Sequence, residues 1–228
     1  MTPRQMSGNG SGASHAGGQN WMLRWQRVAR RIRVPLGFLA AALYLFDLWR
    51  RAPRPAAVAL SLLLVIPGLG LRAWAAGTVK KDRELARTGP YAHTRNPLYL
   101  GSMLIAAGFA LALMSWLLAV VLVVGFAVIY IPVIASEERF LRSAFPEFDS
   151  YCRSVPRLFP RFTAAPAPES GSSGRPGDQG QRFSFALYRR HREYNSALGA
   201  ALLLLSLLIL RPALELLQHA VQQALSGL

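Results

Sequence analysis

Polar side chains that could bind a charged organic ligand stand at both ends of a long uncharged run. Arg95, Asn96 and Tyr99 lie at its start, and Glu137 and Glu138 directly follow its end. A guanidinium can hold a carboxylate in a bidentate grip, whereas carboxylates and aromatic faces attract a cation. Charged groups at the edge of a lipid-embedded segment are costly, and by default they mark a functional site.

The uncharged run is long enough for two membrane-spanning helices. Pro97 to Ser136 contains forty residues and no Asp, Glu, Lys or Arg. At 1.5 Å per helical residue its length is roughly 60 Å, about twice the ~30 Å hydrocarbon thickness of a bilayer. We therefore expect a helical hairpin that turns near residues 114–116. Such a hairpin returns both polar groups to the same membrane face.

Composition indicates one small polytopic membrane protein. Of the 228 residues 52% are hydrophobic and the mean hydropathy is +0.25, which is too apolar for an ordinary soluble domain. The net charge is +15, but the basic residues lie in short segments between apolar runs and do not form the single basic face of a nucleic-acid-binding protein. The lone Cys152 excludes an intramolecular disulfide and a multi-cysteine metal site. No metal and no protein partner is expected.

The predicted fold class is all-α, a polytopic membrane helical bundle of about five transmembrane helices with a cofactor pocket on the cytoplasmic side. Proline-rich and glycine-rich segments divide the chain into parts. These are a disordered tail over 1–20, a core with four spans over 21–162, a flexible linker over 163–182, and an extension with a fifth span over 183–228. We expect the individual spans over 34–49, 56–76, the two arms of the hairpin, and 195–210.

Local signals refine three of these segments. Gly68 and Gly70 follow no strand, so we interpret them as sites of close helix packing and not as a nucleotide loop. Residues 137–151 keep a helical rhythm typical of a helix on the membrane surface. Pro146 predicts a break after Phe145 and a restart with the proline in the first turn. Arg211 and Pro212 predict the end of the fifth span, with the remaining residues resting on the opposite membrane surface. The apolar positions of the surface helix share one stripe: Phe140, Ala144, Phe148 and Tyr151.

The basic residues beside the spans predict the orientation. The N-terminal lead-in and the segments before and after the hairpin are basic, whereas the hairpin turn carries no charge. By the positive-inside rule, the N-terminus, the polar groups and the linker lie in the cytoplasm and the C-terminus lies outside. The loop with Arg50, Arg51 and Arg54 is the exception. The bias towards arginine over lysine favours a bacterial source, and hence the inner membrane.

Two motifs at the ends of the hairpin resemble a known family. GPYAHTRNPLYLG, from Gly89 to Gly101, and EERFLRSAFPEFDSYCRSVPRLFP, from Glu137 to Pro160, are similar to the isoprenylcysteine carboxyl methyltransferase and phospholipid methyltransferase family of integral membrane enzymes. That family usually has His in place of Asn96 and Gly in place of Pro146. The resemblance implies S-adenosylmethionine as methyl donor, bound at the cytoplasmic end of the helices, and a lipophilic acceptor that enters from the membrane lipids.

The resemblance and the residue types together suggest a role for each side chain. Arg95 and Glu138 are the expected catalytic groups, and Arg95 would hold the donor carboxylate or an anionic acceptor. Adjacent helical residues point about 100° apart, so we expect one glutamate in the pocket and the other to support it or to meet Arg95. Pro97 fixes a helix start, Tyr99 offers its hydroxyl or ring, Gly101 permits close approach, and Tyr91 covers the pocket. The predicted cofactor-binding residues are Tyr91, Arg95, Asn96, Pro97, Tyr99, Gly101, Glu137 and Glu138.

Several alternatives stay open. Asn96 leaves the motif without an evident base unless His93 or a glutamate serves, which favours a carboxylate or another easily ionised acceptor. A sterol-reductase-like oxidoreductase that uses NADPH shares features of the first motif, although its usual Lys-Tyr-Gly element is absent after the last core helix. Arg157 and Pro160 are expected to shape the exit of the chain from the surface helix, with a ligand contact as the less favoured alternative. A transporter or membrane scaffold is the non-enzymatic alternative, and it predicts no cofactor binding.

Overall fold

The computed structural model describes residues 36–50, 52–79, 85–165 and 183–226. Every regular element within these ranges is a helix, which confirms the all-helical prediction for them. The expected tail over 1–20, the basic lead-in and most of the linker lie outside the described residues. After a helix over 36–50, the elements are α2 (Pro55–Thr78), η1 (Gly89–Ala92), α3 (Pro97–Ala112), α4 (Trp116–Ala144), α5 (Phe148–Ser154), α6 (Phe185–Arg190), α7 (Tyr194–Leu205), η2 (Ser206–Leu210) and α8 (Arg211–Ser226).

Helices α2 and α3 pack against each other through glycines. A Cβ atom at Gly68 would lie 2.8 Å from the Gly101 carbonyl oxygen, and one at Gly101 would lie 2.7 Å from the Gly68 carbonyl oxygen. Gly108 continues this contact, because its Cβ would lie 2.6 Å from Val65. The packing prediction is therefore confirmed for Gly68. It is wrong for Gly70, where an added Cβ would meet no atom within 4 Å.

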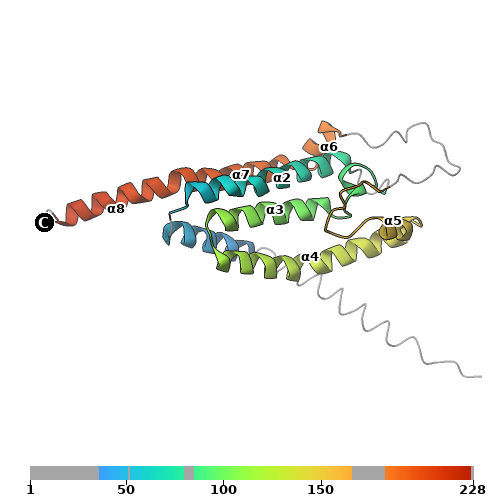
Figure 1. The fold of residues 1–228 in the computed structure, drawn as a ribbon, viewed down its shortest axis with the longest axis horizontal. Coiled ribbons are helices and arrows are strands. Elements are labelled where there is room, and N and C mark those ends of the chain that lie inside the picture. The colour runs from blue at the N-terminus through green and yellow to red at the C-terminus, as the bar shows by residue number, and fades with distance from the viewer. Residues whose placement is uncertain (1–35, 51, 80–84, 166–182, 227–228) are drawn as a thin grey trace, which may run out of the picture.

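The hairpin predicted from the uncharged run is formed by α3 and α4. The chain turns at Met114, which has a φ of +49°, and the Ser115 side chain caps α4 by accepting a hydrogen bond from the Leu118 N–H at 3.2 Å. The turn meets the helix over 36–50, because the Ser115 hydroxyl donates a hydrogen bond to the buried Asp47 carboxylate. Both polar groups of the sequence consequently lie at the end of the bundle remote from this turn (Figure 1).

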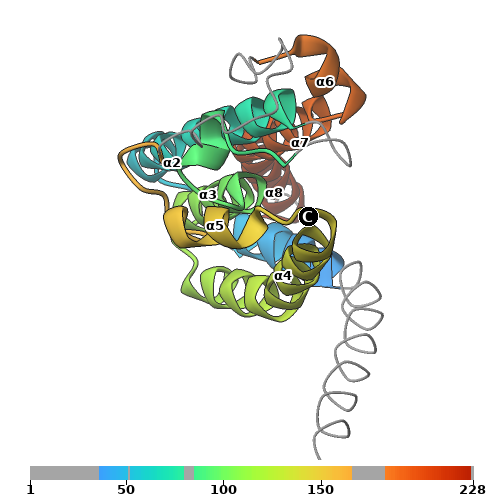
Figure 2. The ribbon, with the colours of Figure 1, turned by 90° about the vertical axis from the view of Figure 1, so that its right-hand side faces the viewer.

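The core joins five helical segments around α3. Figure 2 looks along the bundle and shows α3 between α2 and α4. Tyr44 donates a hydrogen bond to the Leu203 carbonyl at 2.9 Å and shares one with the Ser206 hydroxyl at 2.7 Å, which ties the helix over 36–50 to α7 and η2. Core side chains come from every one of these helices, among them Tyr44, Leu48, Val65, Phe109, Leu118, Ala200 and Leu207.

The exterior of the bundle is apolar, as a bilayer requires. Among the described residues, Pro55–Thr78 and Trp116–Ala144 are long and apolar enough to cross a membrane, and Pro97–Ala112 and Tyr194–Ile209 are shorter apolar helices. Large side chains on their surfaces face outward, with Leu63, Trp116 and Val123 between 67% and 72% exposed. An apolar surface of this extent is suited to lipid and not to water. The total of five spans stays a prediction.

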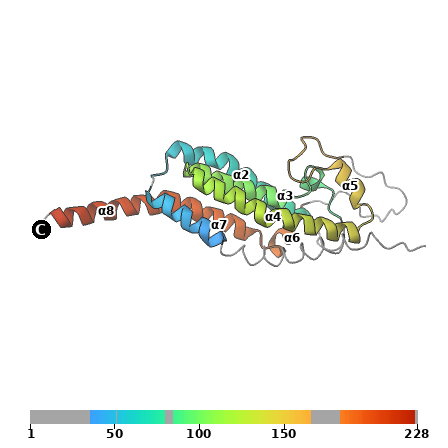
Figure 3. The same cartoon turned by 90° about the horizontal axis from the view of Figure 1, so that it is seen from below.

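The C-terminal helices form a nearly continuous rod. Figure 2 shows α7 beside α2, and Figure 1 and Figure 3 show α8 projecting beyond the bundle, away from α5. Helical structure continues through Arg211 and Pro212, since α8 starts at Arg211 directly after η2. That the membrane span ends at these two residues stays a prediction. The π-type turn η2 directly precedes the first turn of α8, which contains the proline. Residues 211–226 therefore extend from α7 and do not fold back onto the bundle.

The segment after α4 also differs from its prediction. Helix α4 ends at Ala144 with Phe145 as its C-cap, which confirms the predicted break. The predicted restart is wrong, because α5 starts at Phe148 and Pro146 lies in the turn between the two helices. The expected stripe is divided between the two helices. Phe140 on α4 is exposed, whereas Phe148 and Tyr151 on α5 are buried together with Val155. The proline turn folds α5 back over the end of the bundle.

Candidate functional site

Glu138 lies at the centre of an ion-pair cluster at the end of α4. Its Oε1 atom is 2.9 Å from Arg95 Nη1 and 3.0 Å from Arg157 Nε, and its Oε2 atom is 2.6 Å from Arg157 Nη2. The Glu138 side chain is only 8% exposed. One buried carboxylate thus serves two guanidiniums from separate segments of the chain, and the cluster carries a surplus of one positive charge.

Backbone hydrogen bonds hold those two segments side by side. The Arg95 N–H donates to the Pro156 carbonyl at 2.9 Å, and the Arg161 N–H donates to the His93 carbonyl at 2.9 Å. The Asn96 side chain donates from Nδ2 to the Arg157 carbonyl at 2.8 Å. Asn96 stands directly before α3 but makes no side-chain cap on it. Its amide is used to fix the chain that carries Arg157.

Arg95 retains an unused hydrogen-bond donor. Its Nη1 atom also contacts Cys152 Sγ at 2.9 Å, yet its Nε atom is buried and has no partner among the described residues. A buried N–H without a partner is rare, because leaving it unsatisfied costs free energy. Together with the surplus positive charge, this donor makes the cluster suited to a further anionic group.

Glu137 faces a second, more open group of side chains. Its Oε1 atom accepts a hydrogen bond from the Tyr99 hydroxyl at 2.8 Å. The Tyr99 ring meets Tyr130 edge to face at 4.9 Å between centroids, and Tyr130 stacks on Phe126 at 4.0 Å. A carboxylate beside aromatic faces is a favourable environment for a cation. The two adjacent glutamates therefore differ: Glu138 is engaged by arginines, whereas Glu137 is exposed beside an aromatic cluster.

Buried tyrosines support the loop behind the cluster. The Tyr151 hydroxyl donates to the Tyr91 carbonyl at 2.7 Å. Burial raises the pKa of both phenols well above the ordinary value, so both stay neutral at physiological pH. The hydrogen bond to Glu138 raises the pKa of Arg157, whereas burial lowers the pKa of Arg87. The Arg157 guanidinium therefore keeps its charge across the physiological range.

Two expected site residues have packing roles in the structure. Gly101 faces α2, where its Cβ would collide with Gly68 and Arg72, and its predicted part in cofactor binding stays a prediction. The Tyr91 side chain is buried against Ala75 and Ala86, so this ring serves a small core, and its role as a pocket cover stays a prediction. Pro97 begins α3 as predicted.

Sequence reasoning missed Arg157 as a member of the site. We expected it to shape the exit of the chain from the surface helix, whereas its guanidinium makes two hydrogen bonds with Glu138. The available signal was its place inside the second motif, twenty residues or fewer from the paired glutamates. It also missed Arg72, a lone charge within an apolar span, which pairs with Glu193 of the C-terminal extension.

The fold and the cluster define a class: a helical bundle with an apolar exterior and an arginine-glutamate site at one end. Residues 56–147 match the family model described as phospholipid methyltransferase. The family resemblance predicted from the two motifs is thereby confirmed. The matched segment contains α2, α3 and α4 with Arg95 and Glu138, whereas Arg157 and the C-terminal helices lie beyond it.

Two curated relatives match part of the chain. It is 39% identical over 110 residues to the cobalt-zinc-cadmium resistance protein CzcN of Cupriavidus metallidurans, with 45% of this chain and 51% of the relative covered. It is 42% identical over 84 residues to the nickel-cobalt-cadmium resistance protein NccN of Alcaligenes xylosoxydans xylosoxydans, with 37% and 39% covered. The chain thus spans about half of these relatives or less. No solved structure matches it.

Proposed function

We propose that this protein is an integral membrane methyltransferase that transfers a methyl group from S-adenosylmethionine to a lipidic or membrane-soluble small molecule. The observation that carries the proposal is the convergence of Arg95 and Glu138 at one end of the bundle, within the segment that matches the phospholipid methyltransferase family. The metals named for the relatives do not enter it. Among the described residues, no group of three His, Cys, Asp or Glu side chains is placed to hold a metal ion.

The residues of the site fit the chemical groups of S-adenosylmethionine. This donor carries a carboxylate, an ammonium group and a sulfonium cation. The surplus positive charge of the Glu138 cluster and the unused Arg95 Nε donor suit the carboxylate. The Glu137 carboxylate and the rings of Tyr99 and Tyr130 suit the cationic groups. The donor set thus complements both signs of charge in the ligand.

Each side chain then has a defined task. Arg95 and Arg157 would bind the anionic end of the donor, and Glu138 acts as a positioning residue that holds both guanidiniums. Glu137 would face the cationic end. When bound, the sulfonium supplies an electrophilic methyl group for in-line displacement, a reaction in which alignment and the exclusion of water matter most. The apolar faces of α3 and α4 limit access by water and leave the approach from lipid to the acceptor.

We propose a carboxylate or another easily ionised group as the methyl acceptor. Such an acceptor needs no general base, and Asn96 occupies the position where the first motif would offer an imidazole. His93 is held elsewhere, because its Nδ1 atom lies 2.8 Å from the Arg161 carbonyl oxygen. Since a carbonyl can only accept, this nitrogen carries the proton. His93 thus positions the loop that follows Arg157.

A binding titration tests the proposal on the detergent-solubilised full chain. We expect S-adenosylmethionine and S-adenosylhomocysteine to bind and NADPH not to bind. Arg95→Ala and Glu138→Gln should each weaken donor binding at least tenfold, which corresponds to about 1.4 kcal/mol. Arg139→Gln is the matched control, because Arg139 neighbours Glu138 but its exposed side chain bonds the Ala135 carbonyl of its own helix. Binding of NADPH alone would overturn the proposal in favour of an oxidoreductase, and binding of none would favour a scaffold.

A second experiment identifies the acceptor. Membranes with and without the protein are incubated with methyl-labelled donor, and the lipid extract is analysed for labelled species. Label that is released by mild alkali indicates a methyl ester and hence a carboxylate acceptor.

We also propose that the protein lies in a bacterial inner membrane with the Glu138 cluster on the cytoplasmic side. A phosphatase fused after residue 228, which is active only outside the cytoplasm, tests this orientation.

A further inference from the structure

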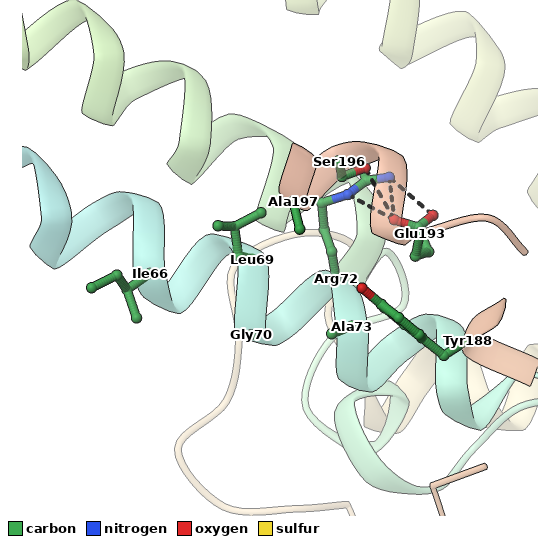
Figure 4. A pocket seen from close by; sticks show the side chains of 9 residues that line it. All are labelled: Ile66, Leu69, Gly70, Arg72, Ala73, Tyr188, Glu193, Ser196 and Ala197. Carbon is green, nitrogen blue, oxygen red and sulfur yellow. Dashed lines mark hydrogen bonds and ion pairs between the residues drawn. The ribbon is translucent and has the colours of Figure 1, made fainter. Parts of the chain in front are cut away.

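A cavity of about 330 Å³ lies between α2 and the C-terminal helices (Figure 4). Its volume falls within the range of small-molecule sites, roughly 300–1,000 Å³. Most of its wall is apolar and is formed by Ile66, Leu69, Ala73 and Ala197. Ile66 is 62% exposed on the outer surface of a predicted membrane span, so the cavity opens towards the lipid side of the bundle. An apolar chain is therefore the kind of group that can enter it.

One wall of the cavity carries a partly buried ion pair. Arg72 Nη2 lies 3.0 Å from Glu193 Oε1 and 2.8 Å from Glu193 Oε2, and Arg72 Nε lies 3.2 Å from Oε2. Arg72 Nη1 donates to the Leu98 carbonyl at 3.2 Å and to the Ser102 hydroxyl at 2.5 Å, which fixes the guanidinium on α3. The side chains of Arg72 and Glu193 are 19% and 12% exposed. The guanidinium thus uses its remaining donors, Nε and Nη2, to bind one carboxylate.

Further donors surround that carboxylate position. The Ser196 hydroxyl donates to Glu193 Oε2 at 3.2 Å. Figure 4 shows the Tyr188 hydroxyl turned towards α2 beside Arg72, and this hydroxyl has no hydrogen-bond partner among the described residues. The cavity therefore combines a guanidinium and two hydroxyls with apolar walls. This donor set recognises an anion that is attached to an apolar group.

We propose that this cavity binds an amphiphile whose anionic headgroup replaces the Glu193 carboxylate on Arg72 and whose apolar chain lies against Ile66, Leu69 and Ala73. Glu193 comes from the turn between α6 and α7, outside the segment that matches the family, and it occupies the place of the headgroup. The exchange conserves charge balance at Arg72, because one anion leaves and another arrives. Carboxylates and phosphates share the required chemistry.

The binding partner of Arg72 is therefore exchangeable, in contrast to the partners of Glu138. Arg72 remains anchored on α3 through Leu98 and Ser102 when Glu193 leaves. The C-terminal segment also remains attached to α2, because the Ser184 N–H donates to the Gly77 carbonyl at 2.8 Å and His191 Nδ1 lies 3.0 Å from the Ala76 carbonyl oxygen. Ligand exchange at Arg72 does not require the bundle to come apart.

Native mass spectrometry of the full chain in a non-ionic detergent tests this site. The probes are dodecanoate and dodecyl phosphate, with dodecanol as the neutral probe of equal chain length. We expect one molecule of an anionic probe per chain, at least tenfold tighter than dodecanol. The stronger of the two anions identifies the headgroup as a carboxylate or a phosphate. Glu193→Gln leaves the Arg72 charge without its partner, so anion binding should tighten at least fivefold.

A pair of glycine variants separates the site from a general effect on folding. Gly70 lines the cavity and Gly199 on α7 does not, and an added Cβ at either position meets no atom within 4 Å. Leucine is also a better helix former than glycine, so neither variant threatens its helix. Gly70→Leu should reduce binding of the anionic probe at least tenfold, whereas Gly199→Leu should leave it unchanged.

Equal binding of dodecanol and dodecanoate, or unchanged binding by Gly70→Leu, would overturn the inference and leave the Arg72–Glu193 pair as a structural link. The measurement needs no methyl donor, so it does not depend on the proposed methyltransferase activity. Donor binding that is intact while no amphiphile binds would contradict the cavity site alone. The opposite result would contradict the methyltransferase alone.

Discussion

Two arginine-glutamate clusters flank the first turns of α3, and they differ in the ratio of their charges. Glu138 is shared by Arg95 and Arg157, whereas Glu193 pairs with Arg72 alone. The first cluster consequently has a surplus positive charge and a buried Arg95 Nε without a partner among the described residues. The second is neutral and its guanidinium is saturated. A neutral pair can take an anion only by releasing its own carboxylate, whereas the first cluster can add one.

The clusters also differ in how firmly the chain holds them. Backbone hydrogen bonds to Pro156 and from Arg161 fix the loops around Glu138 on both sides. Glu193 stands in a turn beside α6, a helix of only six residues. Rigid placement suits a site that must align reacting groups, and a residue in a turn between two helices suits exchange of a ligand. The two regions thus combine similar residue types with different tasks.

Removal of the shared carboxylate should have the largest effect. Loss of one member of a buried pair leaves an uncompensated charge and typically costs about 3–5 kcal/mol. Glu138→Gln should therefore lower the free energy of unfolding by about 3 kcal/mol, and Glu193→Gln by clearly less, since Arg72 keeps its bonds to α3. Chemical unfolding of the solubilised protein, followed by circular dichroism, measures both. A larger loss for Glu193→Gln would reverse the proposed ranking of the clusters.

Substitution at the close contact between α2 and α3, which separates the two clusters, should have the next largest effect. A Cβ at Gly101 would lie 2.6 Å from Arg72 Cγ and 2.7 Å from the Gly68 carbonyl oxygen, so Gly101→Ala must push α3 away from α2. Overpacking of this kind typically costs about 1–3 kcal/mol, and here it should also weaken donor binding because α3 carries Tyr99. Gly70→Ala is the control on the facing helix, and it should be neutral or stabilising by up to about 1 kcal/mol. Equal stability of Gly101→Ala and Gly70→Ala would show that α2 and α3 can move apart at this contact without a cost in free energy.

The sequence was sufficient for the parts of the fold that follow from local patterns. An uncharged run of fixed length predicts the α3–α4 hairpin, and the hairpin alone predicts that Arg95 and Glu138 meet. The helical rhythm of residues 137–151 was misread, because periodicity does not reveal that the turn at Pro146 folds α5 back on the bundle. The π-type turn before Pro212 was equally hidden, since it depends on the geometry of a helix that continues past a proline.

Contacts between segments far apart in sequence could not be predicted. Arg157 reaches Glu138 only because the chain after α5 returns along the loop before α3, a path fixed by backbone hydrogen bonds with no sequence signature. Arg72 and Glu193 are separated by 121 positions, and no pattern in α2 or in the turn before α7 indicates the pairing. A lone charge within an apolar span indicates that a partner exists, but not which residue it is.

A smaller effect tests how the Arg157 segment is held. Asn96→Ala removes the hydrogen bond from Nδ2 to the Arg157 carbonyl, and an average hydrogen bond contributes about 1 kcal/mol. Donor binding should weaken severalfold, because Arg157 would lose its fixed position. Asn96→His should retain most of the affinity, since an imidazole N–H can donate to the same carbonyl. The same loss in both variants would indicate that the amide shape, and not its donor, is required.

The free energy of unfolding should fall as the pH rises above 10. Burial raises the pKa of Tyr91 and Tyr151 in the folded state, whereas the unfolded phenols keep an ordinary pKa near 10. Above that pH the unfolded chain loses these protons first and binds fewer than the folded chain, so stability declines as pH rises. The expected loss is about 1 kcal/mol for each tyrosine between pH 10 and 11.

The variant Tyr151→Phe tests this origin of the pH dependence. Its absolute stability should be lower, because the bond to the Tyr91 carbonyl is gone, but its decline with pH should be shallower by the contribution of one phenol. Unfolding titrations at a series of pH values measure the slope, and an identical slope in the variant would mean that Tyr151 already ionises as freely in the folded protein as in the unfolded chain.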